Sequence, residues 1–145
     1  PAIITCPAGV SQSSAAPSTA PRARPSAATR ALTSAMATAA CARLEAAGCR
    51  ILGRNVRFRE GEIDIVADDG GTLVFVEVRM RRSDGFGGAV GSVDAFKRRR
   101  LVRAAQHFLL QHYGTGSRLP PCRFDVVTAD GDGIREWIRD AFAAD

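Results

Sequence analysis

The sequence is poor in lysine, in closely spaced cysteines and in long apolar runs. Lys97 is its only lysine, so arginine supplies the other 19 of the 20 basic residues. No apolar run approaches the roughly 18 residues that a membrane-spanning helix needs, which argues against an integral membrane protein. The four cysteines, at positions 6, 41, 49 and 122, form neither a C-x-x-C pair nor a zinc-like spacing. We therefore expect reduced, mostly buried thiols in a cytoplasmic protein.

Several familiar kinds of site are also missing. The run FGGAVG lacks both G-x-G-x-x-G and Walker spacing, so it predicts a mobile loop and not a nucleotide-binding fingerprint. His107 and His112 lie on one predicted helix at a spacing that separates them by about 140° around its axis, so that helix alone cannot bring them to one metal. No Ser/His/Asp or Cys/His arrangement is evident. Both histidines are expected to be surface or packing residues.

Residues 1–30 predict a disordered low-complexity tail. They are rich in Ala, Ser, Pro and Thr and show no apolar period, so they cannot bury enough surface to offset the entropy of ordering. The absence of acidic residues before Glu45 would also suit an organellar transit peptide, and this alternative stays open. Residues 31–145 have the length of one domain with a core of its own.

The positive charge is unevenly distributed. The net charge is +5, and three arginines of the tail account for much of it, leaving 17 basic against 15 acidic residues in 31–145. Residues 79–103 hold eight basic side chains against two acidic ones. Such a stretch suits contacts with phosphate, although a charge run is more often a solvated helix face.

Hydrophobic periodicity and turn residues predict an α/β order of elements. We expect a helix over 32–47 stopped by Gly48, a three-strand meander over RILGRNVRFR, EIDIVA and TLVFVEVRM, a helix over 92–113 with Ser92 as its N-cap, and a strand over CRFDVVTA. The apolar side of the second helix should comprise Val93, Phe96, Leu101, Ala105, Phe108 and Leu109. The last run, IREWIRDAF, fits a strand or a short helix equally well. Aromatic side chains, Phe96 and Trp137 included, are expected in the core.

Residues 62–79, EIDIVADDGGTLVFVEVR, combine a hairpin pattern with charges. If Asp69 and Gly70 are the central turn residues, Glu62 faces Glu77, and Asp64 is the diagonal neighbour of Glu77, roughly 7–8 Å away at Cα. Strand alternation places Glu62, Asp64, Glu77 and Arg79 on one face and Ile63, Ile65, Val74, Val76 and Val78 on the other. The charged face also carries Val66, Leu73 and Phe75, as though a second layer covers one end of it. A three-residue turn would change this parity.

These charges could be a solvated sheet face, but like charges directly opposed on neighbouring strands are destabilising unless a cation lies between them. Carboxylate oxygens suit Mg²⁺, which keeps several waters and binds through one or two carboxylates and substrate phosphates. Such a metal lowers the pKa of a bound water and stabilises charge on phosphorus. Asp64 and Glu77 as ligands, with Arg79 beside them, would therefore describe a phosphodiester hydrolase.

The motifs GEID, FVEVR, FGG and RFDVV, followed by WIRDAF, resemble the YraN family of small bacterial proteins over roughly residues 40–142. That family is similar in turn to restriction-endonuclease-like nucleases, particularly archaeal Holliday junction resolvases, whose pattern is an acid on one strand and Glu-x-Lys on the next. The resemblance implies that Asp64 is the first acid and Glu77 the second, and places Arg79 at the lysine position. It also implies a glutamate where this chain has Ala37. Arginine binds phosphate but does not readily give up a proton, so Arg79 is not expected to act as a general base.

Taken together, these features predict an α/β, restriction-endonuclease-like fold with a mixed sheet flanked by helices. The predicted function is Mg²⁺- or Mn²⁺-dependent DNA hydrolysis through Asp64, Glu77 and Arg79, with Glu62 as the nearest replacement for the missing third ligand. Phosphate contacts are expected from Lys97, Arg100, Arg103 and Arg81. Two alternatives stay open: a non-catalytic nucleic-acid-binding module on a degenerate nuclease scaffold, and a protein-interaction domain. Whether the DNA is branched, and whether two copies form a homodimer, the sequence does not decide.

Overall fold

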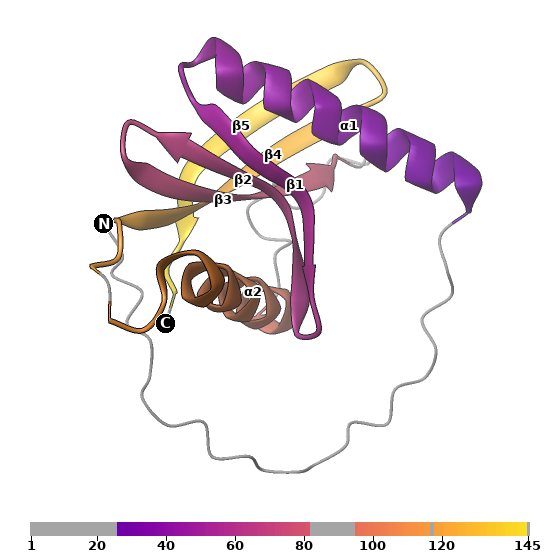
Figure 1. Cartoon of the computed structure of the whole chain (residues 1–145). Helices are drawn as coiled ribbons and strands as arrows, with labels where there is room; N and C mark the ends of the chain where they lie inside the picture. The colour runs from indigo at the N-terminus through magenta and orange to yellow at the C-terminus, as the bar shows by residue number, and fades with distance from the viewer. Residues whose placement is uncertain (1–25, 82–94, 117, 145) are drawn as a thin grey trace.

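Two helices enclose a five-stranded mixed sheet, as the predicted α/β class requires (Figure 1). The computed structural model describes residues 26–81, 95–116 and 118–144. The elements are α1 (Ala27–Ala46), β1 (Arg50–Phe58), β2 (Gly61–Asp69), β3 (Thr72–Met80), α2 (Ala95–Tyr113), β4 (Cys122–Asp130) and β5 (Gly133–Phe142). Neither described helix is long and apolar enough to cross a membrane. The arrangement is consistent with a restriction-endonuclease-like α/β fold.

The strands lie side by side in their order along the chain. β1, β2 and β3 form the predicted antiparallel meander, and β5 pairs antiparallel with β4. β3 and β4 are parallel because the chain crosses back through α2 between them. The run IREWIRDAF, which periodicity left undecided, is an edge strand.

Helix α1 begins earlier than predicted. The Ser26 hydroxyl accepts a hydrogen bond from the backbone N–H of Thr29 at 3.2 Å, so Ser26 is the N-cap and residues 27–30, predicted to lie in the tail, are helical. The predicted stop is confirmed. Gly48 takes a positive φ of 93°, and the next amide, that of Cys49, closes the helix on the Leu44 carbonyl at 3.0 Å. Ser92, Val93 and the FGGAVG loop lie outside the described residues, as does the tail up to residue 25.

The turn between β2 and β3 differs from the predicted one. Its central residues are Gly70 and Gly71, with φ of 58° and 98°, and Asp69 pairs with Thr72. Two consecutive positive φ angles suit glycine far better than aspartate, and the Asp68 carboxylate further fixes the turn by accepting the Gly71 amide at 2.8 Å. The predicted register is therefore wrong by two residues. Because the turn still has two residues, the predicted parity of the two strands survives.

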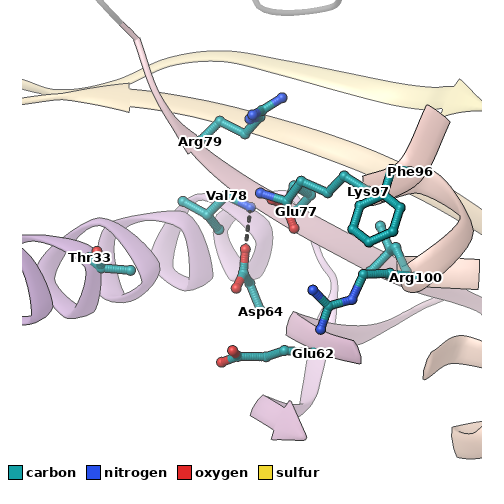
Figure 2. A pocket seen from close by; sticks show the side chains of 10 residues that line it. Thr33, Glu62, Asp64, Glu77, Val78, Arg79, Phe96, Lys97 and Arg100 are labelled. Carbon is teal, nitrogen blue, oxygen red and sulfur yellow. Dashed lines mark hydrogen bonds and ion pairs between the residues drawn. The ribbon is translucent and has the colours of Figure 1, made fainter. Parts of the chain in front are cut away.

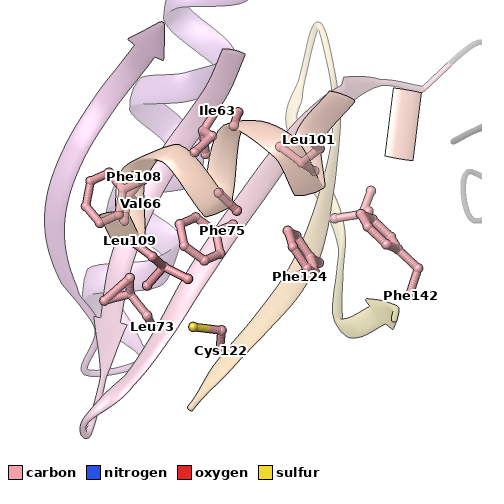
Figure 3. Close-up of a cluster of buried hydrophobic side chains, with 13 residues drawn as sticks. Ile63, Val66, Leu73, Phe75, Leu101, Phe108, Leu109, Cys122, Phe124 and Phe142 are labelled. Carbon is pink, nitrogen blue, oxygen red and sulfur yellow. The ribbon is translucent and has the colours of Figure 1, made fainter. Parts of the chain in front are cut away.

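Two hydrophobic clusters fill the two sides of the sheet. On the α2 side, Phe75, Phe124, Leu101, Phe108 and Leu109 pack with neighbouring residues (Figure 3). On the α1 side the members come from the helix and the central strands: Ala40, Cys41, Leu44, Cys49, Ile65, Ala67, Val74, Val76 and Val127. The second layer expected over Val66, Leu73 and Phe75 is thus α2.

One predicted feature of the apolar face is wrong. Ile65, Val74 and Val76 belong to the cluster under α1, but Ile63 packs in the cluster under α2. Strict alternation is therefore broken between Ile63 and Ile65, at Asp64. The β2–β3 pairing also ends there, with Ile65 opposite Val76 as its last pair. The strands separate where the acidic residues begin.

Candidate functional site

A hollow of about 530 Å³ opens where β2 and β3 separate, between α1 and the first turns of α2 (Figure 2). Its lining joins side chains from four elements: Thr33, Glu62, Asp64, Glu77, Val78, Arg79, Phe96, Lys97, Arg100 and Leu101. All four charged residues that the hairpin pattern singled out therefore line one hollow. Their positions within it differ.

Asp64 and Glu77 are brought together, although by a different register from the predicted one. Each lies one residue beyond the last β2–β3 pair, so they are near-opposite neighbours and not diagonal ones. The Asp64 carboxylate accepts the backbone N–H of Val78 at 2.8 Å, beside Glu77. Burial, followed by the charge of Glu77 and a hydrogen bond with it, raises the pKa of Asp64 to about 7. Two acids thus share a site in which both cannot easily be charged at once.

Glu77 is the more deeply buried of the two, with only 4% of its surface exposed. Its neighbour on β4 is Val126, which belongs to the cluster under α2, so Glu77 lies on the α2 side of the sheet. Lys97, from the first turn of α2, makes an ion pair with the Glu77 carboxylate. The chain's single lysine therefore reaches the second acid from a helix, although the sequence predicted only a phosphate contact for it.

Glu62 and Arg79 lie at the rim. Glu62 is exposed and pairs with Arg57 on β1 at 3.5 Å. The predicted opposition of Glu62 and Glu77 is wrong, because the observed register brings Asp64 near Glu77 instead. Arg79 is opposite Thr128 of β4, and in Figure 2 its guanidinium points away from Asp64. Both side chains thus lie at the edge of the hollow, outside the acidic pair.

The donor set can be compared with what a divalent cation needs. Across residues 26–81, 95–116 and 118–144 no group of three or more His, Cys, Asp or Glu side chains is arranged to hold a metal. Asp64 and Glu77 alone offer two carboxylates, which fits Mg²⁺ bound through one or two acids, several waters and a substrate phosphate. It does not fit a cation that needs a complete protein cage. Both residues stay predicted ligands, whereas Glu62 would have to leave Arg57 to join them.

Ala37 is buried in α1, one helical turn after Thr33. Because residues four apart share a helix face, the position at which the resemblance implies glutamate lies next to the hollow. A methyl group there contributes packing and no ligand. This explains why the acidic set has two members at its centre.

The predicted phosphate-binding residues divide into two groups. Lys97 and Arg100 line the hollow, and Arg100 also donates to the Glu60 carbonyl at 3.2 Å. Arg103 and Arg81 are exposed and lie outside the lining. Lys97, Arg100 and Arg103 recur every three residues along α2, so they can follow a phosphate backbone from the hollow outward.

Phe96 was predicted to be a core residue, and this is wrong. It is 57% exposed, lines the hollow and lies with its ring 5.8 Å from the Arg100 guanidinium. Apolar periodicity does not reveal this, because Phe96 lies more than one turn before α2 reaches the sheet at Leu101. An exposed aromatic ring beside arginine is the kind of surface on which a nucleobase stacks.

The described cysteines and histidines are less suitable as catalytic residues than the acidic pair. Burial raises the pKa of Cys122 to about 11, and it also raises the pKa values of Cys41 and Cys49, so all three are unreactive thiols at neutral pH. His107 contacts Glu60 at 3.0 Å, and His112 packs against Phe108, in agreement with the predicted packing roles.

A second buried acid was not predicted. Asp125, from the RFDVV motif, is fully buried and accepts hydrogen bonds from Arg123 at 3.0 Å, from the Trp137 indole N–H at 2.9 Å and from the Asp140 backbone at 3.0 Å. Its neighbour on β3 is Val76, which belongs to the cluster under α1, so Asp125 lies on the opposite side of the sheet from Glu77. Both of its oxygens accept hydrogen bonds, and those from Trp137 and Asp140 join β4 to β5.

Comparison with known proteins agrees with the resemblance seen in the motifs. The model of the uncharacterised protein family UPF0102, the YraN family, matches residues 37–129. A UPF0102 protein of Xanthomonas axonopodis pv. citri (strain 306) is 55% identical over 105 residues, which cover 72% of this chain and 84% of that protein. A UPF0102 protein of Dechloromonas aromatica (strain RCB) is 53% identical over 102 residues, covering 70% and 80% of the two chains. This chain belongs to the UPF0102 family.

Proposed function

We propose that the protein hydrolyses phosphodiester bonds in DNA, with Mg²⁺ or Mn²⁺ held by Asp64 and Glu77. The observation that carries this proposal is the meeting of two carboxylates from neighbouring strands in one hollow, where burial and then the charge of Glu77 raise the pKa of Asp64 to about 7. An ionised Asp64 beside Glu77 costs folding free energy, and a divalent cation between the two carboxylates would lower that cost.

The metal would supply an activated water and would stabilise charge developing on phosphorus. The chain's own residues would do the rest. Lys97, Arg100 and Arg79 place three cations around the acids, where they can bind and orient the phosphates on either side of the scissile bond. Phe96 adds a surface for a base next to that bond.

Lys97 also offers a replacement for the lysine that the resemblance implies at the position of Arg79. It is the residue that reaches Glu77, and unlike Arg79 it has an amine that can exchange a proton with water. We therefore assign to Lys97, and not to Arg79, the role of orienting the attacking water. Lys97→Arg keeps the charge, and Lys97→Met keeps much of the side-chain length without the charge. Cleavage lost in both variants supports an amine-specific role, whereas full activity in Lys97→Arg contradicts it.

A second candidate is a non-catalytic nucleic-acid-binding module. Buried Ala37 favours it, because the face of α1 beside the hollow has no third acid. In that case the basic rim would bind phosphate, and the ion pair between Glu77 and Lys97 would be structural.

Cleavage of labelled linear, flapped and four-way-junction DNA with Mg²⁺ or Mn²⁺ separates the two. A catalytic metal supplies several kcal/mol, so Asp64→Asn and Glu77→Gln should each lower the rate at least ~100-fold. Asp132→Asn, at a side chain that is 88% exposed, is the matched control and should cut normally. DNA that is bound by the native protein but never cut would reject the hydrolase and leave the binding module.

A further inference from the structure

A second hollow, of about 490 Å³, lies between the C-terminal half of α1 and strand β5. Trp137 lines it together with Arg43 from α1 and Arg139 from β5. The Arg139 guanidinium lies 4.1 Å from the centre of the indole ring, and that of Arg43 lies 5.4 Å from it. One aromatic ring thus holds two arginine side chains from different elements.

Contacts with buried residues of the sheet hold the Trp137 side chain in place. Its indole N–H donates to the buried carboxylate of Asp125 at 2.9 Å, and its ring packs beside the hydrophobic cluster under α1. A side chain already held in one rotamer loses little conformational entropy when a ligand binds to it. The ring is therefore preformed, and the two arginine side chains lie against it.

The charge on this surface is only partly balanced. Among the described residues, no carboxylate lies within ion-pair distance of Arg43 or Arg139, whereas Arg135 nearby is paired with Asp130 and Asp132. Glu136 is the one acid in the lining. Two guanidinium groups around one ring repel each other, and a bound anion would relieve that repulsion.

From this arrangement we propose that Arg43, Trp137 and Arg139 form a binding site for the phosphodiester backbone of a nucleic-acid strand. Planar guanidinium groups bind phosphate through paired N–H donors, and an indole supplies the stacking surface that bases require. Thr33 of the first hollow and Arg43 of this one are separated by about 15 Å along the axis of α1, or roughly four base-pair steps. The site itself does not depend on cleavage elsewhere in the molecule.

Trp137 is the only tryptophan in the chain, so its fluorescence reports on this site directly. Titration of the full chain in EDTA with a single-stranded oligonucleotide, a duplex, a mononucleotide and inorganic phosphate should change the emission with the two polymers at far lower concentration than with the small anions. Arg43→Gln and Arg139→Gln should each weaken the response about 3–10-fold and lower its salt dependence, because each removes a phosphate contact. Arg118→Gln, which removes the same charge from an exposed position on another loop, should stay within about twofold of the native protein.

Several results would overturn the site. The site is rejected if fluorescence anisotropy shows that labelled DNA binds while the tryptophan emission stays unchanged and both arginine variants keep the native affinity. Equal responses to phosphate and to the strand would instead mark a small-anion site, and an equal response to a polyglutamate peptide would mark a general polyanion surface. Absence of cleavage with a retained fluorescence response would reject the proposed hydrolase alone, so the two proposals fail separately.

Discussion

Asp64 in the first hollow and Asp125 between β4 and β5 show how differently one residue type can be used. Asp125 accepts hydrogen bonds from Arg123, Trp137 and a backbone amide, so its charge is satisfied within the fold. Asp64 accepts one backbone amide, and burial together with the charge of Glu77 raises its pKa to about 7. The first arrangement stabilises the native state. The second leaves a carboxylate pair that a ligand can stabilise further.

Removing the satisfied acid should have the largest effect on stability. Asp125→Ala leaves the Trp137 N–H and the Asp140 amide without an acceptor and takes one carboxylate from Arg123, so we expect the free energy of unfolding to fall by roughly 3–5 kcal/mol. Urea denaturation measures it, with Asp132→Ala as the exposed control. A loss no larger than that of the control would contradict the structural role given to Asp125.

Replacing Asp64 should change the free energy of unfolding in the opposite direction. Folded Asp64 keeps its proton up to a pH of about 7, whereas the unfolded side chain loses it near 3.8, so the folded state binds more protons between these values. Stability should therefore fall as the pH rises from 3.8 to about 7 and then level off. Asp64→Asn lacks this loss and should be more stable than the native protein at pH 8 by roughly 1–4 kcal/mol.

Urea denaturation without metal at pH 4.5 and pH 8 tests this difference. The native protein should lose stability between the two conditions relative to the variant. If both proteins show the same pH dependence, the raised pKa of Asp64 is wrong. Added Mg²⁺ should reduce the difference at pH 8, because a bound cation stabilises the ionised acids.

The side of the sheet that holds the acidic pair also depends on close backbone packing. A methyl group on Gly61 would come within 2.6 Å of the Arg100 carbonyl oxygen, so Gly61→Ala must push β2 from α2. We expect a loss of about 1–3 kcal/mol in the free energy of unfolding. Gly131→Ala, where the added methyl meets nothing within 4 Å, should leave stability nearly unchanged. Equal effects of the two changes would show that α2 can shift at no cost.

The smallest expected loss of stability comes from removing the indole N–H that donates to Asp125. Trp137→Phe keeps most of the ring but removes the indole N–H, so we expect a loss of about 1–3 kcal/mol, below that of Asp125→Ala. In the Asp125→Ala background the same change should cost less, because the acceptor is already gone. Additive losses in the double variant would mean that the ring packing, and not the hydrogen bond, is what matters.

Local patterns predicted most of the fold, since the strand TLVFVEVRM and the helix stop at Gly48 are properties of neighbouring residues. The register error arose because Asp69-Gly70 and Gly70-Gly71 are both sequences that suit a two-residue turn. The structure identifies the second pair, because Gly70 and Gly71 both have positive φ angles. In the site, alternation and an assumed two-residue turn predicted that Asp64 and Glu77 lie close together, although the predicted register was wrong. No local pattern could show that Lys97 reaches Glu77, that Phe96 is exposed or that Arg43 lies beside Trp137, because each depends on how distant elements pack.

The parallel pairing of β3 with β4 sets the order in which these parts can assemble. Asp64 and Glu77 belong to one hairpin and approach each other early, whereas Val126, the partner of Glu77, lies 49 positions later in the chain. Until that distant strand docks, β3 is an open edge with unpaired backbone groups and a row of valines. Such long-range closure slows folding, because the chain must pass through α2 before β4 can pair with β3.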